Sequence, residues 1–598
     1  MSLKTRFSLV ALALGATFSA SATEDVIVVT GDRFDSAPEQ QLTIINTIER
    51  VEIEKISPTS VADLLERLPG VSVTRNGGAG QNASISIRGA NSDHVLVLVD
   101  GIRINSATLG SVSFSTISPE QIERIEVVKG PRASVWGSDA IGGVIQIFTR
   151  KLDQGQWYAG AAVGSDAYGR LAAGVGVGHG DGRTSLTLST EQGDGFDAKR
   201  DGEDDDDGFD RITAGINGGQ TLNNQWQLNW VGQYNTGNNE YDSSYGGNEA
   251  DFDNFLWNLG AQYNQGDYTS KLSVGQARDY NDNFRDGSPD HSIYETRREQ
   301  LNWSNQYLPS DVLTLIGGVD FYNESVRGDY AQDERDVLGV YALARADLDA
   351  WLLEASVRYD DVENIDSETS YNLSAAYRFG NGWRLTAGHG TAFKAPTFND
   401  LYWPGSGNPD LRSETASNSD LTLSYSGDGY NAYLSVFHND VEDLIDWFNT
   451  GVKNEFDYDI WAVDNIAEAR LQGIELSVNF SSLGLDHQVA YTYLDAEDKQ
   501  KDEQLEGRSE HEFDYSASYA WTQWDLTLDY HYQGKRKERG DNYLDPYHKV
   551  DLSLGYELSE SWFVRLKANN LLDEEIITSA NYNGPGTEWF LSVSYTQF

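Results

Sequence analysis

The sequence predicts an all-β transmembrane barrel of about 22 antiparallel strands, with an N-terminal mixed α/β plug domain inside the lumen. Three features support this prediction. Apolar and polar residues alternate with period two through most of the chain, the apolar faces begin or end in Trp and Tyr, and short turns alternate with long polar loops. A soluble sandwich or propeller also alternates, but it requires neither the aromatic ends nor the asymmetry of the loops.

The first residues predict export from the cytoplasm. Lys4 and Arg6 precede an apolar stretch over residues 7–18, and the small residues at 19–22 match the cleavage pattern of a signal peptidase. A membrane anchor is the weaker alternative, because about 20 apolar residues are needed to span a bilayer. We therefore expect residues 1–22 to be a signal peptide.

Residues 23–39 are expected to be a linker that carries an extended segment. A β-branched run follows the cleavage site, and such a run can add as an edge strand to the sheet of a partner. An ordinary first strand of the next domain is an equally good interpretation of the spacing. The segment consists of Asp25, Val26, Ile27, Val28, Val29 and Thr30.

Residues 40–150 are predicted to form the plug, a small mixed α/β domain. Apolar spacing predicts a helix over 60–68, with Ser60 as its N-cap and Pro69-Gly70 as its stop. Two pairs of β runs are expected as well: 95–99 with 102–104, joined by the hairpin turn Asp100-Gly101, and 122–128 with 144–148.

Residues 151–598 are predicted to form the barrel. In the segment 524–533, Trp524 and Leu528 lie on one face of a strand, whereas Asp525 and Thr527 lie on the other. At roughly 10 residues per strand plus uneven loops, a segment of this length accommodates about 20 to 24 strands. The same alternation recurs at 226–230, 513–521 and 550–558, and tight connections such as 522–523 and 559–561 contrast with long ones such as 197–208 and 535–546.

Charge and cysteine content exclude several classes of function. The chain has 93 acidic and 44 basic residues, a net charge of -49, so it repels the phosphate backbone of nucleic acids. Cysteine is absent, which excludes disulfides, thiolate metal sites and cysteine nucleophiles. We find no phosphate-binding loop and no zinc-protease motif, and nothing in the sequence indicates an enzyme.

Several segments carry a specific resemblance to a known family. In the plug they are 64–71, 87–89, 98–101, 129–131 and 135–144, and in the barrel they are 390–396, 407–411 and 569–573. At these segments the chain resembles the TonB-dependent outer-membrane receptors. Within that family the segments 75–81, 93–98 and 137–140 are most similar to those of cobalamin receptors. The resemblance covers nearly the whole chain after the signal peptide.

The resemblance implies active transport across the outer membrane of a Gram-negative bacterium. The energy would come from TonB, which would bind the segment from Asp25 to Thr30, and the ligand would be cobalamin or a related corrinoid. Outer-membrane lipids would surround a barrel that we expect to be a monomer. Siderophore or haem uptake by the same family and a non-transporting structural barrel remain alternatives.

The ligand is expected on two loops of the plug that face outward. Their glycine and asparagine content suits close approach of the backbone and adaptable hydrogen bonding. The candidate ligand-binding residues are Asn76, Gly77, Gly78, Gln81, Asn82, Ser84, Asn105, Ala107, Thr108, Leu109 and Ser111.

The acidic run at 201–208 is a candidate calcium site. Crowded carboxylates repel one another, and calcium relieves this by gathering 6 to 8 oxygen ligands. An EF-hand does not fit, because Ala214 would occupy its twelfth position. A solvated acidic loop is the plain alternative. The resemblance implies structural calcium ions bound by Asp197, Asp205, Asp207, Tyr241, Asp242, Asp251 and, less securely, Asp253.

Overall fold

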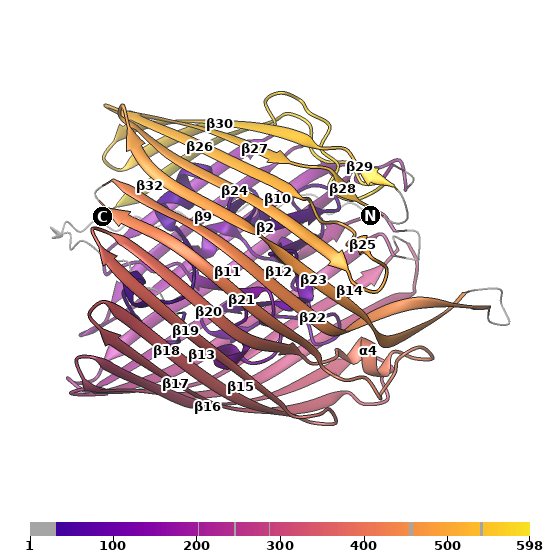
Figure 1. The fold of residues 1–598 in the computed structure, drawn as a ribbon. Coiled ribbons are helices and arrows are strands. Elements are labelled where there is room, and N and C mark those ends of the chain that lie inside the picture. The colour runs from indigo at the N-terminus through magenta and orange to yellow at the C-terminus, as the bar shows by residue number, and fades with distance from the viewer. Residues whose placement is uncertain are drawn as a thin grey trace.

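The structure, a computed structural model, is a closed β-barrel with a plug domain inside it (Figure 1). It describes residues 31–200, 202–243, 247–285, 287–427, 429–453, 459–538 and 542–597. The expected signal peptide and the segment from Asp25 to Thr30 lie outside the described residues. The predicted fold class is confirmed: 22 antiparallel strands close the barrel around the plug.

The plug contains one five-stranded sheet and one separate hairpin. The sheet has the order β1-β6-β7-β4-β5, and the hairpin pairs β2 with β3. Both predicted β pairs form: β4 and β5 are an antiparallel hairpin, and β6 pairs with β7. The elements are β1 (Ile45–Glu49), α1 (Arg50–Ile56), α2 (Val61–Leu65), β2 (Val71–Arg75), β3 (Ala83–Ile87), β4 (Val95–Val99), β5 (Ile102–Arg103), β6 (Ile122–Lys129), α3 (Ala133–Trp136) and β7 (Gly143–Thr149), with 3-10 turns η1 (Pro38–Gln40), η2 (Ser92–His94), η3 (Phe114–Thr116) and η4 (Pro119–Gln121).

The helix predicted over 60–68 is shorter than expected. Ser60 caps it as predicted, in a capping box with Asp63, but α2 ends at Leu65. Pro69 lacks an amide hydrogen and disfavours helical geometry in the residue before it, and Gly70 then turns the chain with φ +70°. Helical spacing of apolar residues therefore continues past the last helical residue, because Leu68 still packs on the plug core from the turn.

The barrel strands run from β8 onward and close where the last strand pairs with the first. They are β8 (Trp157–Gly164), β9 (Gly169–Gly178), β10 (Gly182–Phe196), β11 (Asp207–Thr221), β12 (Trp226–Glu240), β13 (Glu249–Gln265), β14 (Tyr268–Phe284), β15 (His291–Ser310), β16 (Leu313–Arg327), β17 (Glu334–Leu348), β18 (Trp351–Val362), β19 (Glu368–Gly380), β20 (Trp383–Lys394), β21 (Glu414–Gly427), β22 (Tyr430–Lys453), β23 (Asp459–Ser482), β24 (Leu485–Asp498), β26 (His511–Trp521), β27 (Trp524–Gln533), β30 (Tyr547–Ser559), β31 (Trp562–Asn569) and β32 (Glu588–Gln597). Short extra pieces in the outer loops are α4 (Phe398–Tyr402), β25 (Glu503–Gln504), β28 (Arg536–Lys537) and β29 (Tyr543–Leu544).

The two faces of the barrel wall are inverted relative to those of a soluble protein. In β27, Leu528 is 38% exposed, whereas Thr527, on the opposite face of the strand, is 4% exposed. An apolar outer surface with a polar interior is the arrangement that lipid requires of a barrel. Aromatic side chains ring one end of this surface, where Trp157 stacks on Tyr595 and Trp524 contacts Tyr556. No helix in the described part of the chain has the length and apolar character to cross a bilayer.

The connections at the two ends of the barrel differ in length, as the sequence predicted. Thr522-Gln523 joins β26 to β27, whereas the loops after β10, β20 and β31 are long. Tight turns mark the periplasmic end and long loops the extracellular end of such barrels. At the extracellular end β22 and β23 continue as a ribbon beyond their neighbours (Figure 1).

Buried ion pairs fix the plug to the barrel wall at several points. Arg88 pairs with Glu475 of β23 at 2.9 Å, and Arg33 pairs with Asp320 of β16 at 2.6 Å. Glu120 lies 3.0 Å from Arg170 of β9. Removing one partner of a buried pair leaves an uncompensated charge, so these contacts hold the plug in one position.

Candidate ligand-binding and metal site

The first ligand loop of the plug, residues 76–84, comprises the tight turn between β2 and β3 and the first two residues of β3. Asn76 donates its amide to the carbonyl of Asn82 at 3.0 Å, and Gln81 donates its amide to Gly78 at 3.1 Å. Asn82 and Ser84 are exposed on its outer side, whereas Gln81 is buried. This loop can therefore offer side-chain contacts to a ligand mainly through Asn82 and Ser84.

The second ligand loop, residues 105–111, is braced by its first residue. Asn105 is buried and accepts from the amide of Val97 at 2.8 Å, while its Nδ2 donates to Val95 and Gly110. Its polar atoms are thus used inside the plug, and it shapes the loop rather than presenting a side chain outward. Ala107 and Thr108 are also buried, Ser111 is half-buried, and Leu109 is exposed at the apex.

A cavity of about 390 Å³ lies beside this apex, between the plug and the outer loops of the barrel. Thr108 and Leu109 line it from the plug, and Trp403 and Trp447 line it from the barrel. Trp447 is oriented by a hydrogen bond from its Nε1 to Asp400 at 3.0 Å. The rest of the lining is mainly polar and includes Asp93, Lys394 and Glu414, so Leu109 and the two indole rings are apolar surfaces among polar groups. Such a mixed lining can cover apolar parts of an organic ligand and hydrogen-bond to its polar groups. The sequence interpretation did not include these barrel residues, although Asp400, Trp403 and the lining residue Lys394 lie in or near the segments that carried the family resemblance.

Three of the predicted metal ligands come together at the base of the acidic loop. One carboxylate oxygen from each of Asp197, Asp207 and Asp242 lies within 4.8 Å of the other two. Two ligands on opposite sides of a calcium ion are separated by up to about 5 Å, so one ion fits this spacing. The Oδ2 atom of Asp242 is buried without a hydrogen-bond donor in the described structure, which a cation would correct.

The other predicted metal ligands lie outside this group of three. Asp205 is exposed in the same loop, and partial desolvation together with the carboxylates of Glu203 and Asp242 raises its pKa. The hydroxyl of Tyr241 donates to Asn283 at 3.0 Å. Asp251 accepts from Asn238 at 2.9 Å, and Asp253 forms an ion pair with Arg278 at 2.9 Å.

The first ligand loop contacts residues that neighbour the metal group. The Nε2 atom of Gln81 donates to the carbonyl of Glu240 at 2.5 Å, at the end of β12. A side chain at Gly80 would collide with Phe209, because an added Cβ would lie 2.5 Å from the Cβ atom of Phe209. Because of these contacts, the positions of the acidic loops influence the position of the first ligand loop. Glu240, which also accepts from Gly208 at 2.9 Å, was not predicted as part of the site.

Two family descriptions match the chain. "TonB dependent receptor-like, beta-barrel" matches residues 156–571, and "TonB-dependent Receptor Plug Domain" matches residues 37–144. The vitamin B12 transporter BtuB of Photobacterium profundum is 37% identical over 585 residues, covering 96% of this chain and 96% of that protein. BtuB of Vibrio vulnificus is 32% identical over 590 residues, covering 96% of this chain and 95% of that protein.

Solved structures share the fold at lower identity. The siderophore receptor PirA from Acinetobacter baumannii has a TM-score of 0.82 at 19% identity, covering 92% of this chain and 98% of that one. The copper transporter OprC has a TM-score of 0.79 at 18% identity, covering 93% and 100%. Their named substrates differ, so the shared architecture does not select a ligand.

Proposed function

The chain belongs to the family of TonB-dependent receptors, transporters of the outer membrane, and from this premise we propose that it imports cobalamin or a related corrinoid. The observation that carries the choice of ligand is the identity of 37% and 32% with two vitamin B12 transporters over nearly the whole chain. The cavity beside Leu109 supports it, since tryptophan walls suit a large organic ring system.

The proposed binding site combines the plug apex with the outer barrel loops. Asn82 and Ser84 would hydrogen-bond to polar groups on the ligand periphery, and Leu109, Trp403 and Trp447 would cover its apolar faces. Buried residues of the two loops, such as Asn105 and Ala107, would hold these contact residues in place.

We assign calcium to the group formed by Asp197, Asp207 and Asp242. The three residues supply only oxygen donors, and their spacing suits one ion of this type. When bound, the ion would neutralise the crowded carboxylates. Because Asp197 and Asp207 flank one loop and Asp242 belongs to the next, it would also hold the two loops together beside Gln81.

Energy would enter through the segment from Asp25 to Thr30. An extended β-branched peptide ahead of the plug can pair through its main chain with a strand of TonB. Tension on that segment would be transmitted to the plug along the linker, whose Arg33 is anchored on Asp320.

Titration calorimetry of the purified protein tests the ligand. Cyanocobalamin, haem and ferric enterobactin are added separately, each with calcium and then with a chelator. We expect saturable binding of cyanocobalamin alone, weakened by the chelator. Binding of ferric enterobactin or haem in its place would contradict the corrinoid assignment and leave the family membership intact.

A further inference from the structure

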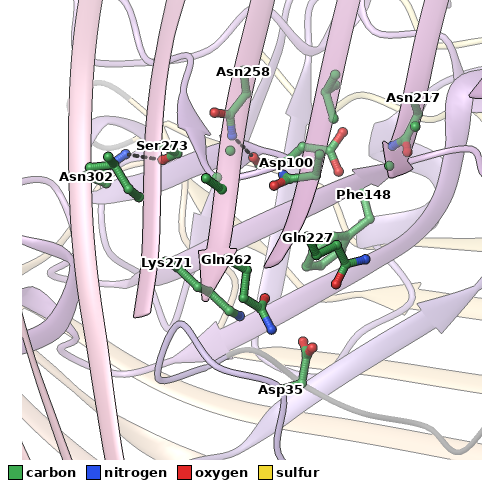
Figure 2. A pocket seen from close by; sticks show the side chains of 18 of the residues that line it. Asp35, Asp100, Phe148, Asn217, Gln227, Asn258, Gln262, Lys271, Ser273 and Asn302 are labelled. Carbon is green, nitrogen blue, oxygen red and sulfur yellow. Dashed lines mark hydrogen bonds between the residues drawn. The ribbon is translucent and has the colours of Figure 1, made fainter. Parts of the chain in front are cut away.

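A second cavity lies on the opposite, periplasmic side of the plug. Its volume is about 880 Å³, and the tight turn between β9 and β10 forms part of its rim. Figure 2 shows lining side chains from the plug and from the wall, among them Asp100 and Asn258. It is larger than the cavity of about 390 Å³ beside the second ligand loop. Amide side chains of the barrel wall line it together with charged side chains. The amides on strands β12–β15 are Gln227, Asn229, Asn258, Gln262, Gln300 and Asn302.

A smaller cavity of about 50 Å³ follows on the same strands toward the extracellular side. On β12 it is lined by Gln233 and Asn235, where the larger cavity has Gln227 and Asn229. Strands β13, β14 and β15 likewise each line the larger cavity with one part and the smaller cavity with the adjacent part. The smaller cavity also reaches Asn105, the first residue of the second ligand loop. The two cavities therefore mark one line along strands β12–β15, from the ligand loop to the periplasm.

The hairpin β4–β5 interrupts this line. Ile102 is fully buried in the apolar cluster that contains Val231, Leu256 and Ala277 of the wall. Asn258 donates to the carbonyl of Asp100 at 3.0 Å, as Figure 2 shows. Gln300 of β15 donates in turn to the carbonyl of Gly101, also at 3.0 Å.

The contacts of this hairpin differ in kind from those elsewhere on the plug. In the described residues, no ion pair joins residues 95–105 to β12–β15. Arg298 donates to the carbonyl of Asn105 at 2.9 Å, but this is a contact to the main chain. Other sectors of the interface are fixed by buried pairs such as Arg88 with Glu475 and Arg33 with Asp320. Separating the hairpin from the wall thus leaves no buried charge without its partner.

We propose that the substrate crosses between the plug and strands β12–β15, and that the hairpin β4–β5 is the gate of this passage. The proposal deepens the proposed import of a corrinoid and rests on it. Corrinoids carry amide groups on their periphery, and the amide side chains of the wall can exchange hydrogen bonds with them. The plug need not leave the barrel, because displacement of one hairpin joins the two cavities.

A first experiment tests the gate without any substrate. Ile102→Ala with Asn258→Ala removes the apolar and hydrogen-bonded parts of the seal, and the purified variant is inserted into planar lipid bilayers. We expect stepwise ion conductance well above that of the wild type. Ser134→Ala with Ser356→Ala, which removes a plug-to-barrel contact of 2.8 Å on β18, is the matched control and should stay at the wild-type level.

A second variant with a milder effect on folding separates loss of the seal from misfolding. Asn258→Ala with Gln300→Ala leaves Ile102 and its apolar cluster in place, and heat-modified mobility in gels reports whether each barrel is folded. Folded variants that conduct no more than the control pair would overturn the gate.

A second experiment locks the passage during transport. The natural chain has no cysteine, so two engineered disulfides can be compared directly. Ser106→Cys with Thr296→Cys replaces hydroxyls 3.4 Å apart beside the passage, and Ser134→Cys with Ser356→Cys replaces the control contact. Uptake of cyanocobalamin by whole cells, divided by the amount bound at the surface of the same cells, should fall at least tenfold in the first oxidised pair only, and a reductant should restore it.

The outcomes separate the two proposals. Equal loss of uptake in both locked pairs would show that the plug moves as a whole, and unchanged uptake in the first pair would place the passage elsewhere; either result overturns the inference. Wild-type cells that import no cyanocobalamin would contradict the proposed function, whereas the conductance experiment would still decide whether the hairpin is a gate.

Discussion

A buried carboxylate oxygen of Asp242 is the strongest single indication of a bound calcium ion. Its Oδ2 atom has no donor in the described structure, and the carboxylates of Asp197 and Asp207 lie beside it. Asp207→Ala with Asp242→Asn should abolish the effect of calcium on cyanocobalamin binding, and in the wild type a chelator should weaken binding about tenfold, or about 1.4 kcal/mol. Calorimetry with and without the chelator measures both.

The exposed Asp204 in the same loop provides a control for net charge. Asp204→Ala removes one carboxylate from the acidic run but none from the group of three, so it should keep the calcium dependence. If calcium does not change the affinity of the wild type, the calcium assignment is contradicted, and the acidic run is a solvated loop.

Glu120 makes plug docking sensitive to acid. Burial alone would raise its pKa, but the guanidinium groups of Arg170, Arg50 and Arg150 outweigh burial and lower the pKa to about 2. A carboxylate whose pKa is lower in the folded state than in the unfolded state stabilises the fold. This contribution is fully present at a pH above the unfolded pKa, near 4.5, and it is lost as the pH falls toward the folded pKa, near 2. The contribution is about 3 kcal/mol.

Thermal unfolding between pH 6 and pH 2 checks this expectation. Glu120→Gln should flatten the loss of stability across that window, whereas Glu39→Gln, an exposed change on the linker, should reproduce the wild-type profile. A wild-type profile that is level from pH 4.5 to pH 2 would contradict the role of Glu120.

At the scale of single elements, the extended segment ahead of the plug is the clearest target. Val28→Pro removes an amide donor that strand pairing with TonB would use. Uptake of cyanocobalamin should fall to background while binding to the cell surface stays normal. Val28→Ile, which keeps the donor and the β-branched shape, should transport normally, and equal uptake by the proline variant would refute the assignment.

The second ligand loop offers a test of the outer cavity. Leu109 is 62% exposed at the apex of this loop, so Leu109→Ala should leave folding intact. Loss of its apolar contact with the ligand should weaken binding by about 1 kcal/mol, or roughly fivefold. Leu483→Ala removes a leucine that is 95% exposed in a periplasmic turn, and this control variant should bind like the wild type.

Local patterns in the sequence predicted most elements but not the ends of all of them. Alternation with period two gave the barrel strands, and Asp100-Gly101 marked the hairpin that the structure contains. The helix α2 ended early, because Leu68 satisfies helical spacing while it packs from a turn. Apolar periodicity reports which residues face the core, and a turn can satisfy it as well as a helix.

At the scale of the whole molecule, the contacts between distant segments were out of reach of sequence patterns. The acidic loop could be found because its charges are consecutive, whereas Arg88 and Glu475 meet across hundreds of residues and resemble many other charged residues in the chain. The aromatic lining supplied by Trp403 and Trp447 was missed for the same reason. Alternation with period two does not distinguish a tryptophan of the ligand cavity from one at the membrane surface, although Trp403 lies close to the segment 407–411 that carried the family resemblance.

The pairing of β32 with β8 closes the barrel and determines when its assembly can be completed. Tyr595 pairs with Ala159, so the ring is completed only after almost the entire chain has been exported. Until then β8 and β31 each keep an open edge, which lipid cannot satisfy and which invites pairing with other chains. Pairing of the last strand therefore competes with aggregation of the incomplete barrel, and the unpaired edges need protection by chaperones until β32 has paired with β8.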